Sequence, residues 1–184
     1  MLRRIPSRSP LLAGFVLGVV LAACGMFPRT LEGLPDGQAW TSLPLSDWLA
    51  EERAEPEAVA LCEECGRAGM TAGAVRLFGT SAREAEAVLR APQGLARALE
   101  TKSKEPRGKA KPVPVRVTTR PLDEAGRSGF LLALSRADGA KPPVYGAALG
   151  LRQGDALGVV LVIGTEAGAV ESLARRIAVE HLGP

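Results

Sequence analysis

Histidine, cysteine and aromatic residues are scarce in this chain of 184 residues. It contains one histidine and three cysteines, and 4% of its residues are aromatic. These low counts disfavour polyhistidine metal sites, histidine-dependent catalytic triads and the aromatic platforms on which nucleic-acid bases stack. The remaining composition is ordinary, with 46% apolar and 23% charged residues. We therefore expect one compact domain rather than a disordered, collagenous or multi-span membrane protein.

A surplus of charge is also missing once the first residues are set aside. The chain carries 23 Lys+Arg and 20 Asp+Glu, a net charge of +3. Arg3, Arg4 and Arg8 are the only charged residues before position 24, so 20 basic and 20 acidic residues follow them. Net charge thus gives no reason to expect an acidic partner, and any electrostatic function has to come from local pattern.

The apolar run near the N-terminus is too short to cross a membrane. Residues 1–8 are basic and Leu11–Ala23 is an apolar run of 13 residues, whereas a transmembrane helix needs about 20. A basic start, a short apolar run and small residues at its end are typical of a secretory signal peptide. We interpret residues 1–23 as such a signal.

Leu21-Ala22-Ala23-Cys24 closes this run and resembles the lipobox of bacterial lipoproteins. The resemblance implies cleavage before Cys24 and acylation of that cysteine, palmitate included. A mature chain of 161 residues (184 minus 23) would then be anchored in the cell envelope, facing the periplasm. Gly25 follows Cys24, unlike the aspartate that marks inner-membrane retention in enteric bacteria, so the outer membrane is favoured.

The stretch after the cysteine reads as a spacer. Pro28, Gly33, Pro35 and Gly37 interrupt it without a periodic apolar pattern. We predict a lipidated tether over residues 24–39 and a single α+β periplasmic domain over residues 40–184.

The first half of that domain is predicted to be mostly helical. Leu45, Trp48 and Leu49 recur at helical spacing and favour a short helix near 46–54. Residues 56–66 favour a second helix, with a strand over 58–61 as the alternative.

A strand over 74–78 then leads into a helix. Ser81 and Glu84 have the spacing of a capping box that would open it. Pro92 interrupts the helical pattern, after which Leu95 and Leu99 continue it.

The second half is predicted to be a meander of strands near 113–120, 130–135, 144–151 and 156–163, closed by a helix over 166–182. The last strand is almost wholly apolar, so both of its faces are expected to be covered. The one histidine, His181, falls in the last turn of the helix, where positive charge complements the helix dipole. The fold class is therefore α+β, with a single antiparallel sheet of about four to five strands and helices packed on it.

Three glycines of the last two predicted strands, Gly146, Gly150 and Gly158, leave their backbone bare. A helix or a ligand can approach the sheet closely at such positions, and helix packing is the expected reason.

Cys62 and Cys65 form the one local motif with a chemical interpretation. In an exported protein, a Cys-x-x-Cys pair is usually a disulfide that locks a turn. The alternative is a thiol–disulfide redox site in which Cys62 attacks and Cys65 resolves the mixed disulfide. Glu63 and Glu64 lie between the cysteines, and their negative charge should raise the pKa of the thiols. The structural disulfide is therefore favoured.

A basic loop over residues 101–112 is the clearest local concentration of charge. It is a candidate for contact with anionic headgroups or cell-wall polymers, and a solvated loop is the alternative. Its basic residues are Lys102, Lys104, Arg107, Lys109 and Lys111.

No motif in the sequence combines a nucleophile with a base, cradles a phosphate or gathers metal ligands. We therefore expect a membrane-anchored envelope lipoprotein with a non-catalytic binding or assembly role. The alternative is a periplasmic redox accessory that uses Cys62 and Cys65. The expected contacts are the membrane, through Cys24, and an envelope protein or cell-wall partner, with no cofactor, no metal and no nucleic acid.

Overall fold

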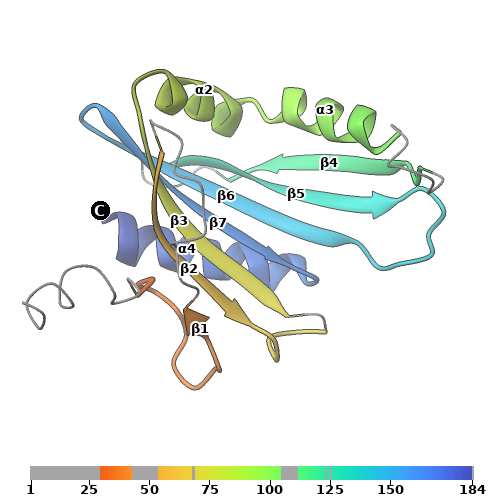
Figure 1. Ribbon diagram of the computed structural model, residues 1–184, viewed down its shortest axis with the longest axis horizontal. Coiled ribbons are helices and arrows are strands. Elements are labelled where there is room, and N and C mark those ends of the chain that lie inside the picture. The colour runs from red at the N-terminus through yellow and green to blue at the C-terminus, as the bar shows by residue number, and fades with distance from the viewer. Residues whose placement is uncertain are drawn as a thin grey trace, which may run out of the picture.

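A computed structural model of the protein describes residues 30–42, 54–67, 69–104, 112–122, 124 and 126–183. The described part contains one antiparallel sheet in the order β1-β2-β3-β7-β6-β5-β4, together with three helices (Figure 1). The strands are β1 (Thr41–Ser42), β2 (Ala54–Cys62), β3 (Met70–Phe78), β4 (Val115–Pro121), β5 (Ser128–Arg136), β6 (Val144–Gln153) and β7 (Ala156–Gly164). The helices are α2 (Gly79–Arg90), α3 (Gln93–Ser103) and α4 (Ala167–Leu182).

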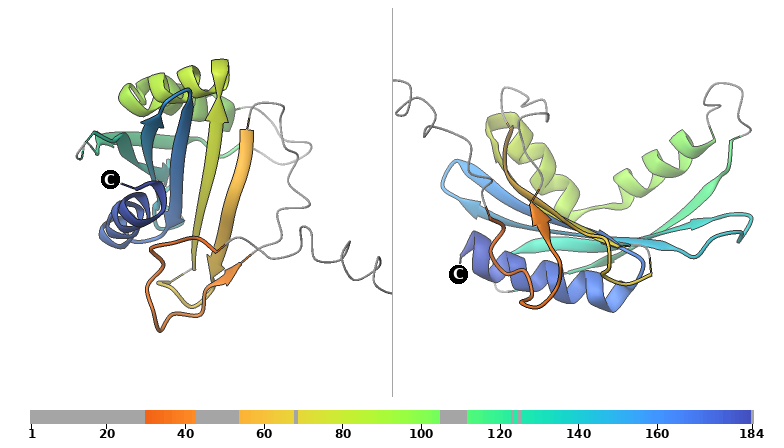
Figure 2. Two further views of the ribbon diagram at one scale, coloured as in Figure 1. Left: turned by 90° about the vertical axis from the view of Figure 1, so that its left-hand side faces the viewer. Right: turned by 60° about the horizontal axis from the view of Figure 1, so that its bottom comes forward.

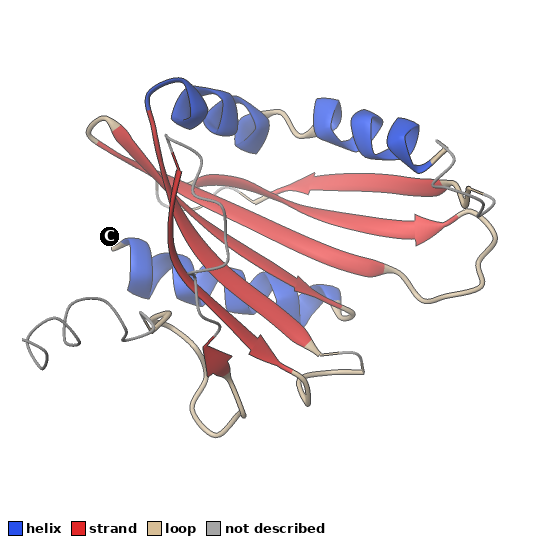
Figure 3. Ribbon diagram, viewed as in Figure 1, coloured by secondary structure: helices blue, strands red, loops and turns tan. Residues whose placement is uncertain are grey.

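The expected α+β class and the closing helix are confirmed, but the sheet has seven strands instead of four to five (Figure 3). Much of the difference lies in β2, where the predicted helix over 56–66 is wrong and the alternative strand is right. Ala58, Ala60 and Cys62 are all buried on one face of β2, at a spacing of two. Small apolar residues give little signal for either structure, and pairing with β3 decides the outcome. The predicted helix over 46–54 falls on residues outside the described part, except that Ala54 begins β2.

Helix α2 begins earlier than predicted. Helix α2 starts at Gly79, directly after β3, and no side chain caps its first turn. The capping box of Ser81 and Glu84 is therefore wrong, because both residues lie inside the helix. Pro92 does separate the two helices and forms the N-cap of α3.

The helices divide between the two faces of the sheet, as the right-hand view of Figure 2 shows. Helix α4 packs on β5, β6 and β7 from one side, which we call the α4 face. Helices α2 and α3 lie on the other side, where α2 packs on β3, β5, β6 and β7 and α3 packs on β4. We call this side the α2–α3 face.

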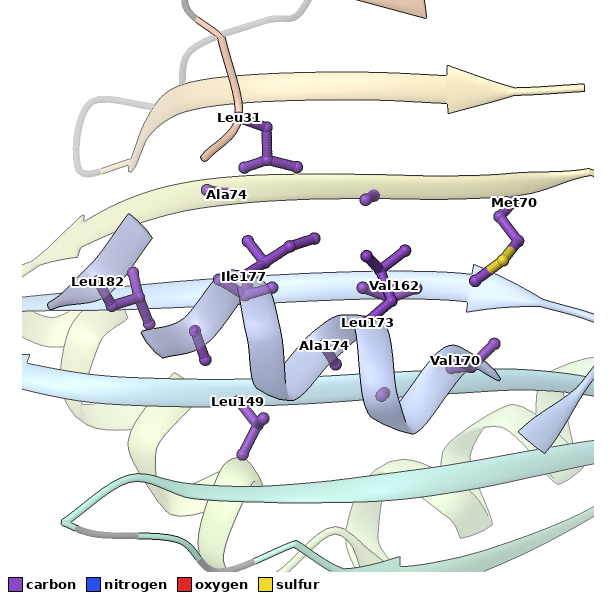
Figure 4. Packing of buried hydrophobic residues seen from close by; sticks show 14 of the residues in the cluster. Leu31, Met70, Ala74, Leu149, Val162, Val170, Leu173, Ala174, Ile177 and Leu182 are labelled. Carbon is purple, nitrogen blue, oxygen red and sulfur yellow. The ribbon is translucent and has the colours of Figure 1, made fainter. Parts of the chain in front are cut away.

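The larger hydrophobic cluster lies on the α4 face (Figure 4). Leu149, Val160, Val162, Val170 and Ile177 are fully buried there. Each such side chain contributes about 1.5 to 3 kcal/mol relative to an exposed one.

Residues 30–42 add a further layer to the α4 face. Leu31 is 3% exposed and belongs to the same cluster as Ile177 of α4 (Figure 4). Gly33 lies so close to α4 that a Cβ atom there would come within 2.8 Å of the Cα of Ile177. The described residues therefore pack on the α4 face from Leu31 onward, within the stretch predicted as tether.

Close helix packing explains two of the three glycines in the last strands. A Cβ on Gly150 would lie 2.4 Å from Leu89 of α2, and one on Gly158 would lie 2.8 Å from Leu182 of α4. The two glycines thus serve opposite faces of the sheet.

Helix α3 also closes the outer edge of β4. The N–H of Val115 donates to Ser103 Oγ at 3.0 Å, and the N–H of Val117 donates to Glu100 Oε1 at 2.8 Å. These bonds use donors that would otherwise be open to pairing with another strand.

Candidate functional site

The most exposed apolar area of the described residues lies on the α2–α3 face. Val144 of β6 and Leu161 and Ile163 of β7 are 41%, 47% and 53% exposed. The expectation that both faces of the last strand are covered is therefore wrong. Val160 and Val162, which alternate with Leu161 and Ile163, are 0% exposed on the α4 face. We call Val144, Leu161 and Ile163 the open strip.

Small residues surround the two side chains of β7 in the open strip. Gly73 of β3 pairs with Leu161, and Gly146 of β6 pairs with Ile163. Leu161 and Ile163 therefore each have a glycine beside them on a neighbouring strand, where no side chain covers the backbone. Neighbouring positions of this part of the face are also uncharged, with Thr71 of β3 as the polar member. This surface suits an apolar side chain from another segment.

Cys62 and Cys65 form a disulfide, as the structural interpretation of the motif predicted. Cys62 ends β2, and Cys65 lies in the turn that leads to β3. The bond closes this turn, while Glu63 and Glu64 point outward and are exposed. Cys62 is 0% and Cys65 5% exposed.

A shallow cleft lies beside the disulfide at the start of α4. It has a volume of about 210 Å³, and Gln38, Cys65, Met70 and Thr165 are among its lining residues. Gln38 Oε1 lies 3.2 Å from Cys65 Sγ. The N-cap of α4 is Glu166, and no side chain bonds to the first turn of the helix.

Glu57, Arg76 and His181 form a partly buried ionic cluster at the other end of α4. Glu57 is 9% exposed at an irregularity in β2 and makes a 2.7 Å ion pair with Arg76 of β3. His181 Nε2 lies 3.5 Å from Glu57 Oε2, while the N–H of Glu32 donates to His181 Nδ1 at 3.4 Å. The single histidine thus joins α4, β2 and the segment 30–42 in a structural role.

A second ionic network joins α4 to the strand β4 and to Glu124. Glu171 pairs with Arg120 of β4 and, at 3.0 Å, with Arg175 one helical turn further along α4. Hydrogen bonding to the Arg120 guanidinium is the main reason why the pKa of Glu171 is lowered. The pKa of Arg175 is raised, chiefly by its hydrogen bond to Glu124.

The candidate basic contact residues are only partly placed. Lys102 and Lys104 are exposed at the end of α3. Arg107, Lys109, Lys111 and the predicted lipidation site Cys24 lie outside the described residues. Among described helices, none is long and apolar enough to span a membrane. The same residues contain no group of three potential metal-ligating side chains.

Comparison of the chain with protein-family models, with curated proteins and with solved structures finds no match. Sequence reasoning found the disulfide through its spacing but missed the open strip and the Glu57 cluster. Glu57 follows Glu55 and Pro56, so no pattern marks it as buried, and an apolar strand likewise gives no signal for the strip.

Proposed function

We propose that this protein is a lipid-anchored domain of the bacterial cell envelope with a non-catalytic binding or assembly role. The observation that carries the proposal is the short separation in sequence between the lipobox and Leu31, a core residue of the described part. Six residues separate Cys24 from Leu31, which is buried in the core of the α4 face. Seven residue steps span at most about 25 Å. An acylated Cys24 would therefore hold the domain directly at the membrane surface, with the segment 30–42 and α4 nearest the anchor.

The anchor is tested by the state of residue 24 in cells of the natural host. Mass spectrometry of the membrane fraction should find a mature chain that begins at an acylated Cys24. A Cys24→Ser variant should lose the acyl groups and the normal cleavage. An intact, unacylated N-terminus in the wild-type protein would contradict the proposal.

The exposed lysines at the end of α3 support a contact with an anionic envelope surface. Each basic residue near such a surface contributes about 1 kcal/mol. We expect that Lys102→Glu with Lys104→Glu lowers co-sedimentation of the purified protein with isolated cell-wall sacculi or with vesicles of anionic lipid. Arg83→Glu with Lys141→Glu is the matched control, because it changes the net charge equally at exposed positions elsewhere. Equal losses in both variants would leave only a net-charge effect and contradict a local basic contact.

A redox role for Cys62 and Cys65 is the second candidate, and the cleft beside Cys65 is the observation in its favour. The burial of both sulfur-bearing residues favours a structural disulfide instead, because thiol exchange needs access to a sulfur atom. A reduction potential below about −300 mV is expected of a structural bond. A potential in the range of thiol oxidoreductases would favour the redox role.

A further inference from the structure

The one histidine of the chain lies where three elements of the α4 face meet. His181 belongs to the last turn of α4, and its side chain is only 14% exposed. Its two ring nitrogens contact different elements. The N–H of Glu32, in the segment 30–42, donates to Nδ1 at 3.4 Å, while Nε2 lies 3.5 Å from Glu57 Oε2 of β2. The imidazole therefore links the start of the segment to the sheet.

The contact with Glu32 determines which ring nitrogen carries the proton. A backbone N–H can only donate, so Nδ1 has to be the unprotonated, accepting nitrogen. A neutral imidazole of this kind carries its proton on Nε2, the nitrogen that lies beside the Glu57 carboxylate. One neutral tautomer thus satisfies both contacts. A doubly protonated ring satisfies only the contact with Glu57.

An irregularity in β2 places Glu57 beside this ring. Pro56 pairs with Val75 and Ala58 with Ala74, which leaves Glu57 as the extra residue of a bulge. Arg76 Nη2 holds Glu57 Oε1 at 2.7 Å, so the other carboxylate oxygen is the one beside His181. Glu57 is therefore an acceptor that stays in place whether the imidazole is neutral or charged.

The charged groups around His181 come from the sheet, from the segment 30–42 and from the end of α4 itself. Those groups are Glu57, Arg76, Glu32, Glu180 and Arg127. Arg76 balances Glu57, and Arg127 donates to the carbonyl of Gly183 at the negative end of the helix. Glu32 and Glu180 are exposed and favour a positive ring. Protonation of His181 is therefore compatible with its surroundings, and its cost falls on one contact, the hydrogen bond from Glu32.

We propose that His181 is a pH-sensitive switch that holds the start of the segment 30–42 against α4 only while its imidazole is neutral. Imidazole is the side-chain group that changes its charge between about pH 8 and pH 5. The added proton occupies Nδ1 and faces the N–H of Glu32, so two donors oppose each other and the hydrogen bond is lost. Leu31 and Gly33 still pack on the α4 face. Acid therefore frees the backbone at Glu32 while the core beside it stays closed.

Amide hydrogen exchange at Glu32 tests the switch in the full chain in detergent solution. NMR follows this exchange and the titration of the His181 ring between pH 8 and pH 5, with each rate corrected for the intrinsic pH dependence of exchange. We expect the protection of Glu32 to fall about fivefold, the worth of one ordinary hydrogen bond. The fall should have the same midpoint as the ring titration. Protection that stays constant through that titration would overturn the proposal.

Two variants separate the two contacts of the ring. In His181→Asn, the amide oxygen takes the place of Nδ1 without titrating in this range, so Glu32 should stay protected at pH 8 and at pH 5. In His181→Gln, the amide takes the place of Nε2 and leaves no acceptor near Glu32, so protection should be low at both pH values. A His181→Asn variant with the pH dependence of the wild type would contradict the switch.

The amide of Val170, at the other end of α4, reports on the fold as a whole. Its N–H donates to the carbonyl of Glu166 at 3.0 Å and has no contact with His181. The protection of Val170 should stay the same in all three proteins from pH 8 to pH 5. A parallel loss of protection at Val170 and Glu32 would show general acid unfolding and would overturn the proposal of a local switch.

Discussion

The α4 face and the α2–α3 face of the same sheet differ in how completely they are covered. On the α4 face, one long helix and the segment 30–42 bury a continuous cluster from β2 to β5. On the α2–α3 face, the smaller cluster lies under α2, and Leu161 and Ile163 beyond it are about half exposed. Alternate residues of β7 thus meet a closed core on one side and an open surface on the other. The difference separates the face that stabilises the fold from the face that is available for contacts.

Removing a large side chain from the closed core should have the largest effect. Ile177→Ala is expected to lower the free energy of unfolding by about 3 to 4 kcal/mol, because it leaves a cavity beneath the segment 30–42. Val179→Ala on the exposed side of the same helix should change it by less than about 0.5 kcal/mol. Urea unfolding of the two variants measures both values, and similar losses would contradict a closed α4 face.

The contact between the segment 30–42 and α4 is tested by a pair of glycines. Gly33 and Gly37 both have positive φ angles, 88° and 82°, but only Gly33 touches α4. Gly37→Ala should cost about 1 kcal/mol for its backbone conformation alone. Gly33→Ala should cost about 3 kcal/mol, because its Cβ also overlaps the backbone of α4. Equal losses in thermal or urea unfolding would show that the segment does not pack there.

The disulfide supports the closed face through the turn between β2 and β3. Reduction, or the double change Cys62→Ala with Cys65→Ala, should lower the free energy of unfolding by about 2 kcal/mol, as the loop entropy of four residues predicts. Reductant should have no further effect on the double variant. A wild-type protein whose unfolding midpoint is insensitive to reductant would contradict this role.

The ionic network at Glu171 should contribute less and should depend on pH. Its folded-state pKa lies below the usual value of 4.5, so the carboxylate stabilises the fold at neutral pH. That contribution is lost as the pH falls from the usual value through the lower folded pKa. Glu171→Gln should therefore cost about 1 kcal/mol at pH 7, and its difference from wild type should shrink in acid.

Glu84→Gln is the control for this prediction, because Glu84 is exposed on α2. It should leave both the stability and its acid dependence unchanged. A constant difference between Glu171→Gln and wild type from pH 7 to pH 3 would contradict the linkage.

The elements that the sequence predicted well are those with one face in solvent. In β4, Val117 is buried while Arg116 and Thr118 are exposed, so the period of two is visible in the chain. In α4, the buried residues recur at helical spacing and the predicted bounds differ from the observed ones by one residue at the start. The disulfide of Cys62 and Cys65 was predicted from their spacing together with the expected export of the chain.

The features that the sequence did not reveal depend on which elements meet. The alanines of β2 fit a helix or a strand, and only pairing with β3 distinguishes them. The residues of β7 are nearly all apolar, so no pattern tells that Val160 is covered and Leu161 is not. Likewise, the contact of Glu57 with His181 joins residues far apart in the chain.

The most direct test of the contrast between the two faces is a comparison of neighbouring residues on β7. Val160 is 0% and Leu161 47% exposed, on opposite sides of one strand. We predict that Val160→Ala lowers the free energy of unfolding by about 2 kcal/mol. Leu161→Ala, although it removes more carbon atoms, should lower it by at most about 1 kcal/mol. Equal losses in urea unfolding, or a larger loss for Leu161→Ala, would contradict the account.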